Sequence, residues 1–245
     1  MLFRSSAPDG YTLAVVNDAH VVNHLLYAKL PYEGMAAFTP ITRIMTSPLI
    51  LCVNAAFAPR NLAEAIAYGK ANPGKAAFGS PTPGATPHLA MGLLMSRSGM
   101  DVLHVPYKGA PAVAQALVAG DLQINFLTPA IAMPLVKAGK LRVLATASRK
   151  RLPTLPDVPA LSETLPGFEV LAWFGLVAPA KTPAAVVTRL NREVVRALSL
   201  PETRERLAGI GFEPDTTTPE EFAAFMSEQA QVLGAVVKQY HITAE

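Results

Sequence analysis

The chain has 245 residues, of which 51% are hydrophobic, and its mean hydropathy is +0.29. This is enough apolar material for one or two cores, which argues against a disordered protein. The 21 Lys and Arg residues exceed the 18 Asp and Glu residues by three, giving a net charge of +3. Because the basic residues are scattered along the chain, the composition does not favour a nucleic-acid-binding protein.

Disulfides, membrane spans and targeting signals are not expected in the sequence as written. Cys52 is the single cysteine, and its apolar surroundings favour a buried strand residue. No apolar run reaches the roughly 18 residues of a transmembrane helix. The start, MLFRSSAPDGY, has no charged region followed by an apolar region, so no signal peptide is predicted. A chain that was complete as written would therefore be cytoplasmic.

Strand-like and helix-like runs alternate along the chain. Runs rich in β-branched and aromatic residues predict strands at 11–16, 41–46, 49–53, 75–80, 101–106, 122–127, 141–147 and 169–179. Apolar spacings of three and four predict helices at 17–27, 61–71, 87–99, 111–120 and 129–139, and near Thr182, Pro201 and Thr218. The proline-rich stretch 151–168 is predicted to be a long connector. Strands and helices that alternate across short loops are typical of a parallel α/β fold.

Three polar loops follow predicted strands. Ligands of open α/β sheets bind at the carboxyl ends of the strands, in the loops that lead into helices. The loops of this kind are Asn17–His20, Ser80–His88 and Asn125–Thr128. The second lies within FGSPTPGATPHLA, which holds three hydroxyl side chains, two glycines and a histidine. It is therefore the strongest candidate for a ligand loop.

The dipeptide Thr-Pro starts four predicted helices, at Thr86, Thr128, Thr182 and Thr218. Its repetition indicates N-capping by threonine rather than function. After Thr86, the N–H groups of His88 and Leu89 are expected to be unpaired, and Gly84 would let the backbone approach a ligand closely. With the loop hydroxyls, this site would suit a carboxylate or phosphate. A capped structural turn is an equally good interpretation of the same residues.

Catalytic and metal-binding patterns are weaker. The motifs GxSxG, GxGxxG after a strand and GxxxxGK[ST] are absent from the sequence. His20 and His24 lie one helical turn apart, but no third metal ligand is close in sequence. A polar helix face capped by Asp18 is the preferred interpretation. His104 is expected to be hydrogen-bonded within the fold rather than to act as a base.

Segments along the whole chain resemble one family. APDGYTL, NPGKAAFGS, HVPYKGAPAVAQALVAGDLQINF, VKAGKLRVLATAS, RLPTLPDVPALSET and TPEEFAAF occur in the order and spacing found in the Bug-type substrate-binding proteins of tripartite tricarboxylate transporters. The resemblance implies a two-lobed α/β fold like that of type II periplasmic binding proteins, with crossing hinge strands. It implies a periplasmic protein without enzymatic activity or cofactor. Such a protein would pass a small mono- or dicarboxylate to membrane transporter components, with no nucleic-acid partner.

The resemblance also implies how the lobes and the site are assembled. Residues 1–75 and 172–245 would form one lobe and 76–171 the other, with the carboxylate in the cleft between them. Trp173 and Phe174 would lie at the second crossing and could wall this cleft. The residues expected to contact the ligand are Asn17, Asp18, His20, Ser80, Thr82, Ala85, Thr86, Pro87, His88, Thr128, Trp173 and Phe174.

The chain departs from the family pattern in three ways. It starts after the signal peptide and first strand, whose glycine-rich loop supplies half of the family's carboxylate site. Prolines 81, 83 and 87 stand where the family has small hydroxyl residues, and 127–129 keep a single hydroxyl in another polar loop. Two alternatives therefore stay open. One is an α/β enzyme for a carboxylated or phosphorylated substrate, suggested by Asp18, His20 and His88, and the other is a truncated remnant without a transport role.

Overall fold

The structure is a computed structural model that describes residues 6–243, and it divides into two compact units. Unit 1 holds the described residues up to Ser47 together with Ala172–Thr243, and unit 2 holds Pro48–Leu171. The sequence-based expectation had assigned residues 48–75 to the first lobe. The structure includes them in unit 2, because strand β3 (Ile50–Asn54) pairs with two strands of that unit.

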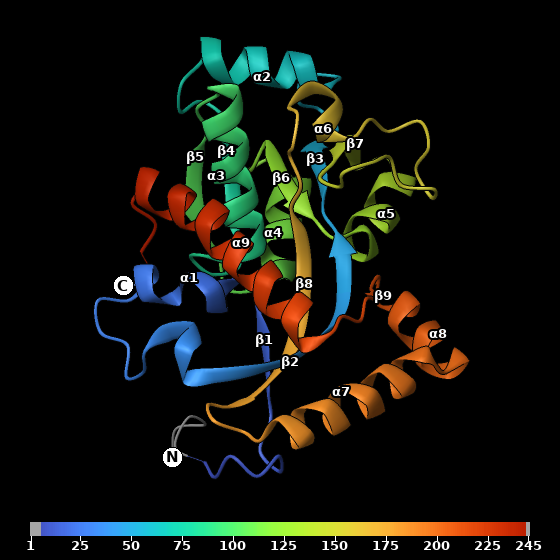
Figure 1. The fold of residues 1–245 in the computed structure, drawn as a ribbon. Coiled ribbons are helices and arrows are strands. Elements are labelled where there is room, and N and C mark those ends of the chain that lie inside the picture. The colour runs from blue at the N-terminus through green and yellow to red at the C-terminus, as the bar shows by residue number, and fades with distance from the viewer. Residues whose placement is uncertain (1–5, 244–245) are drawn as a thin grey trace. The chain divides into compact units, whose positions relative to one another are not determined.

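Unit 1 is built on a four-stranded sheet in the order β1-β8-β2-β9. The strands are β1 (Ala14–Asn17), β8 (Leu171–Pro179), β2 (Phe38–Pro48) and β9 (Glu213–Pro214). β1 runs antiparallel to β8, and β9 runs antiparallel to β2. The helices are α1 (Asp18–Leu26), the 3-10 helix η2 (Gly34–Ala37), α7 (Ala184–Ser199), α8 (Pro201–Gly209) and α9 (Pro219–Gln239). α9 packs against α1 (Figure 1).

Polar side chains attach β2 to the segment that precedes α9. The Thr42 hydroxyl donates to the Thr217 carbonyl at 2.9 Å and accepts from the Thr217 N–H at 3.1 Å. Arg43 forms an ion pair of 2.8 Å with Asp215. Asn191 of α7 donates to the Thr217 carbonyl as well. These bonds join residues that lie far apart in the sequence, so they fix the position of the C-terminal helices on the sheet.

Unit 2 contains two sheets. β3 lies between β6 (Ile124–Leu127) and β7 (Leu141–Thr146), and β4 (Ala77–Ser80) pairs with β5 (Leu103–Pro106). The helices are α2 (Leu62–Ala71), α3 (Thr86–Ser98), α4 (Ala110–Ala119), α5 (Pro129–Lys137) and the short α6 (Leu161–Thr164). The expectation of a parallel sheet holds for β4 and β5. It is wrong for β3, which lies between β6 and β7 and runs antiparallel to both. β3 follows β2 with no helix between them, so no helical crossover leads into it.

Two side chains connect β4 to β6. The Ala77 N–H donates to Gln123 Oε1 at 2.8 Å, and the Gly79 N–H donates to Asn125 Oδ1 at 2.7 Å. Since the pairing advances by two residues on both strands, β4 and β6 run in the same direction. The carboxyl ends of β4, β5 and β6 therefore lie on one side of unit 2, and the loops into α3, α4 and α5 leave from that side.

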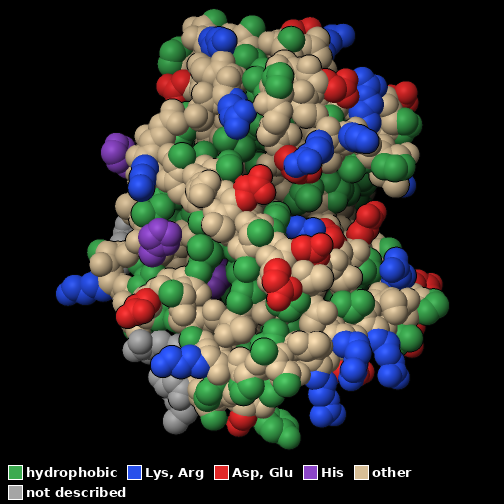
Figure 2. Space-filling model, viewed as in Figure 1, with side chains coloured by type: hydrophobic (Ala, Val, Ile, Leu, Met, Phe, Trp, Pro, Cys, Tyr) green, Lys and Arg blue, Asp and Glu red, His purple; other side chains and the backbone are tan. Residues whose placement is uncertain are grey.

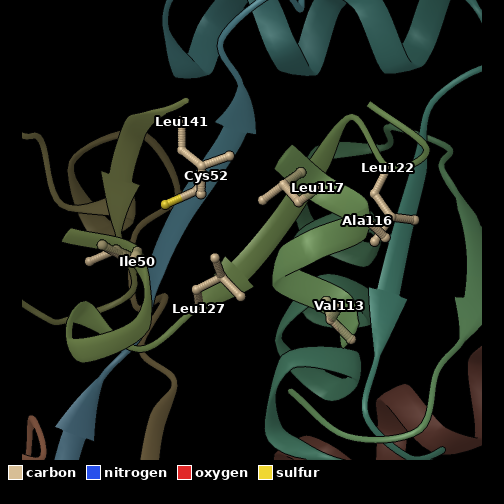
Figure 3. Packing of buried hydrophobic residues seen from close by; sticks show 9 residues of the cluster. Ile50, Cys52, Val113, Ala116, Leu117, Leu122, Leu127 and Leu141 are labelled. Carbon is tan, nitrogen blue, oxygen red and sulfur yellow. The ribbon is translucent and has the colours of Figure 1, made fainter. Parts of the chain in front are cut away.

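An apolar cluster fills the space between the β3 sheet and helix α4 (Figure 3). Its buried members are Ile50, Cys52, Val113, Ala116, Leu117, Leu122, Leu127, Ala132 and Leu141. Cys52 has the predicted place, a buried strand position, and burial raises the pKa of its thiol to about 12. A thiol with such a pKa stays protonated at neutral pH and is a poor nucleophile.

Most predicted elements are present, but the prediction that threonine caps all four helices with a Thr-Pro start is wrong. Asn61 caps α2 by accepting from the Glu64 N–H, and Thr218 forms a capping box with Glu221, as expected. The other three Thr-Pro pairs do not cap through the threonine side chain. The Thr182 hydroxyl instead donates to the carbonyl of Pro179. At these three starts the Thr-Pro pair therefore does not specify the cap, and Thr39-Pro40 lies within a strand rather than at a helix start.

Figure 2 shows acidic and basic side chains interspersed on the visible face. Within residues 6–243, no helix combines the length and the apolar character needed to cross a bilayer.

Candidate functional site

The loop from β4 to α3 lies at the carboxyl end of its strand. Ser80 ends β4 and is fully buried. Gly84 has a φ of +75°, a left-handed conformation that glycine adopts without strain. Helix α3 begins at Thr86, and its N-cap is Ala85 rather than Thr86. The helix therefore starts one residue earlier than the Thr-Pro pair predicted.

This earlier start removes two expected ligand donors. The N–H groups of His88 and Leu89 both donate to the Ala85 carbonyl, at 2.8 and 3.1 Å. The prediction that they are unpaired is wrong, because Ala85 already closes the first turn. Thr82 is exposed, and its carbonyl accepts from the Ala85 N–H at 3.2 Å. The loop is thus a compact turn whose backbone bonds are largely internal.

Two histidines stack beneath the loop. The rings of His88 and His104 lie 3.8 Å apart, centroid to centroid, at an angle of 20°. His104 Nε2 shares a hydrogen bond of 2.7 Å with Ser80 Oγ, which confirms the prediction that His104 is bonded within the fold. The Gly84 N–H donates to His88 Nδ1 at 3.3 Å. A neutral His88 therefore carries its proton on Nε2.

Both imidazoles are held in the neutral form. Burial, and then the proximity of His104, lower the pKa of His88 to about 3. Burial also lowers the pKa of His104. At neutral pH the stack therefore has no charge, and His88 offers one N–H donor through Nε2.

The loop from β6 to α5 contributes less than the sequence suggested. Asn125 belongs to β6, is 1% exposed, and uses both ends of its amide: Oδ1 accepts from Gly79 and Nδ2 donates to the Phe126 carbonyl. It therefore has a structural role. Thr128 is half-buried at the N-cap of α5, where its carbonyl accepts from the N–H groups of the first turn. Its side chain makes no cap bond.

Asn17, Asp18 and His20 lie in unit 1, where β1 passes into α1. Asn17 is the N-cap of α1 without a side-chain cap bond, and Asp18 is buried in the first turn. His20 is 6% exposed, and its ring meets Phe38 edge-on at 4.9 Å. No hydrogen-bond partner for His20 Nε2 is present among residues 6–243. Burial lowers the pKa of His20, so this imidazole is also neutral at pH 7.

The two aromatic residues predicted to wall a cleft differ in their surroundings. Trp173 is 1% exposed and meets the rings of Phe222 and Phe225 edge-on, at 5.7 and 5.4 Å. It belongs to the core between β8 and α9. Phe174 points to the other face of β8, is half-buried, and meets Phe212 at 5.5 Å. Phe174 also pairs with Asn17 across the sheet.

No metal site is formed by the described part of the chain, where no three His, Cys, Asp or Glu side chains come close enough to hold an ion. His24 is exposed, whereas His20 is buried.

The sequence predicted that His104 is hydrogen-bonded but did not indicate that Ser80 is its partner. The two residues lie 24 positions apart on neighbouring parallel strands, so only the strand pairing brings them together. The available signal was the position of both residues near the carboxyl ends of successive predicted strands.

The chain matches a known family over nearly its full length. A family model described as "Tripartite tricarboxylate transporter family receptor" matches residues 1–242. A protein from the gbd 5' region of Cupriavidus necator is 37% identical over 239 residues, covering 97% of this chain and 72% of the relative. Protein BugT of Bordetella pertussis is 32% identical over 241 residues, covering 96% of this chain and 73% of the relative.

Solved structures give the same result. The structure named "R. palustris Rpa4515 with adipate" matches with a TM-score of 0.84 and 29% identity, covering 98% of this chain and 81% of the other. MatC from Rhodopseudomonas palustris, with bound malate, matches with a TM-score of 0.81 and 31% identity, covering 96% and 82%.

Proposed function

Since the chain belongs to the tripartite tricarboxylate transporter family of receptors, we propose that it is a solute-binding protein for a small organic carboxylate. The family resemblance and the fold class drawn from the sequence are both confirmed. The observation that carries the proposal is the match over at least 96% of the chain to two structures that hold adipate and malate.

The geometry of the β4–α3 loop supports a role in carboxylate binding. The loop offers neutral donors, among them the Nε2–H of His88 and the hydroxyl of Thr82. The N-terminus of α3 adds partial positive charge beside them. A neutral donor binds a carboxylate without the cost of burying a second charge. Thr86, His88 and Thr82 are therefore the proposed contacts in unit 2.

His20 is a proposed ligand contact of unit 1. A buried ring nitrogen without a protein partner is costly unless a ligand or water satisfies it. His20 Nε2 meets this description within the part of the chain that the structure describes. Asn17 and Asp18, at the same helix start, are proposed to orient the His20 side chain.

The same geometry disfavours the alternative of an enzyme. Ser80 and His104 have the spacing of a nucleophile and its base, 2.7 Å. Ser80, however, is 0% exposed, and its partner His104 is stacked on His88, so the pair is satisfied within the fold. We infer that this pair is structural and that the ligand is released unchanged.

Location and partners follow from the family and form part of the proposal. Members of the family are receptors of tripartite tricarboxylate transporters, and one solved relative is titled a periplasmic binding protein. We propose that this chain acts in the periplasm and passes its ligand to membrane components of such a transporter.

Isothermal titration calorimetry with malate, adipate and a series of monocarboxylates tests the proposal. We expect saturable binding of at least one acid with one site per chain, weakened at least tenfold by His88→Ala. His24→Ala, which removes an exposed histidine of unit 1, is the matched control and should bind normally. Folded protein that binds none of these acids would refute the proposal. Conversion of a bound acid would favour the enzyme.

A further inference from the structure

A small cavity lies beside the β4–α3 loop, within unit 2. Its volume is about 60 Å³, which is room for roughly four groups the size of a water molecule or a methylene. Strand ends and helix starts supply its apolar lining: Pro81, Pro87, Ala110, Val113, Leu127 and Ile131. Val113 and Leu127, labelled in Figure 3, also belong to the buried cluster. The cavity therefore borders that core.

The cavity has little to offer a polar group. Asn125 lines it, but both ends of its amide already bond to β4 and β6 backbone. The N–H of Val113 donates to Gly109, and that of Ile131 donates to Thr128. The two prolines that line the cavity, Pro81 and Pro87, have no N–H to donate. No charged side chain lines the cavity, and Thr128 brings the one hydroxyl among the lining residues.

A carboxylate or a hydroxyl placed in this cavity would therefore lose its bonds to water without full replacement, whereas methyl and methylene groups would lose nothing. The cavity nevertheless adjoins the proposed carboxylate contacts, since Pro87 lies between Thr86 and His88. An acid that bonded to the loop through its carboxylate would have this apolar space next to its carbon chain.

We propose that the cavity binds the hydrocarbon tail of the ligand and that the chain selects monocarboxylic acids with an unbranched apolar tail of about two to four carbons over hydroxylated dicarboxylates such as malate. This inference rests on the proposed function. It identifies the ligand class through the lining at Ala110, Ile131 and the two prolines.

Calorimetry with the acids from acetate to hexanoate, and with malate, tests the inference on the full chain. Each buried methylene contributes about 0.8 kcal/mol, so affinity should rise about fourfold per carbon until the cavity is full, and then level off. Butyrate should bind more tightly than malate. Equal affinity for all tail lengths, or preference for malate, would overturn the inference.

Two variants on one helix provide a matched comparison. Ala110→Leu fills the cavity from the first turn of α4 and should abolish the gain with tail length, leaving acetate and butyrate within about twofold of each other. Ala119→Leu adds the same side chain at the exposed end of α4 and should leave the gain unchanged. The same response from both variants would contradict the assignment.

A variant with a larger cavity should bind longer acids, and it tests the proposal even if the Ala110→Leu variant fails to fold. Ile131→Ala should move the levelling-off point to a longer acid by one or two carbons. An unchanged chain-length profile in this variant would count against the cavity. If wild-type protein bound no carboxylate at all, the proposed function itself would fail. Binding without chain-length dependence would refute the tail site alone.

Discussion

His88 and His104 are separated in the sequence, and their imidazole rings stack because β4 pairs with β5. The sequence drew attention to His88 through its loop and predicted only that His104 is hydrogen-bonded. It did not predict that the two rings lie 3.8 Å apart or that Ser80 holds one of them. These contacts depend on the register of β4 against β5, which local patterns do not encode.

The stack makes stability depend on pH. Because the pKa of His88 falls to about 3 in the folded chain, the unfolded chain binds more protons below its own pKa of about 6.5. Stability is therefore fully present above pH 6.5 and is lost as the pH falls towards 3. Urea unfolding should show a loss of about 2 kcal/mol from His88 alone between pH 7.5 and pH 5.

The matched variants for this prediction are His88→Gln and His24→Gln. The first should flatten the pH dependence between pH 5 and 7.5, and the second, at an exposed histidine, should retain it. Identical pH profiles for wild type and His88→Gln would show that the buried ring does not govern this dependence.

Asn125 was predicted to belong to a ligand loop, and the structure gives it a backbone-like role instead. Asn125→Ala should leave the buried Gly79 N–H without its 2.7 Å partner and lower the free energy of unfolding by about 1–3 kcal/mol. Asn72→Ala is a suitable control, because Tyr68 O keeps its bond to the Asn72 N–H. A loss of the same size in both variants, measured by chemical unfolding, would refute this role.

At the scale of elements, sequence patterns identified the main helices and strands and failed where an outcome depends on tertiary pairing. Periodicity located the helices, and capping residues located the starts of α2 and α9. Alternation of strands and helices predicted a parallel α/β architecture. The insertion of β3 between β6 and β7 in the opposite direction depends on where the chain re-enters the sheet, and no local pattern reports this.

The four Thr-Pro pairs at predicted helix starts allow capping to be compared within one chain. Thr218 accepts from the Glu221 N–H, whereas Thr128 makes no side-chain cap bond. Thr218→Ala should therefore lower the free energy of unfolding by about 1 kcal/mol, and Thr128→Ala by about 0.5 kcal/mol or less. Thermal and urea unfolding of unliganded protein would measure both. A larger loss at Thr128 would contradict the observed caps.

Close packing of β8 on α9 requires a glycine. A Cβ added to Gly175 would overlap the ring of Phe222, which is fully buried. Gly175→Ala should cost about 1–3 kcal/mol through overpacking. Gly209→Ala, where an added Cβ meets open space, should be neutral or slightly stabilising.

A double-mutant cycle assigns this cost to the predicted contact. Phe222→Leu should relieve part of the Gly175→Ala penalty. The loss of unfolding free energy in the double variant should therefore be smaller than the sum of the losses in the two single variants. Strictly additive losses would place the strain elsewhere.

For the whole molecule, the proposed function as a carboxylate receptor rests on the family match together with the polar loops. Composition argues against disorder and disfavours nucleic-acid binding, and segments along the whole chain resemble the family that the family model confirms. The proposed preference for an apolar tail, unlike the small carboxylate itself, is not indicated by the sequence. It depends on which polar atoms are already paired and on a cavity of about 60 Å³ that sequence patterns do not reveal.

The most direct test of the central claim is a ¹H–¹⁵N NMR titration of the chain with butyrate. The account predicts saturable shifts of the Gly84 and Thr86 amides and of the His88 imidazole, because these groups surround the proposed carboxylate contact. Distant amides such as that of Gly209, near the end of α8, should not move. Saturable binding that shifts other resonances and leaves Gly84, Thr86 and His88 unchanged would contradict the account.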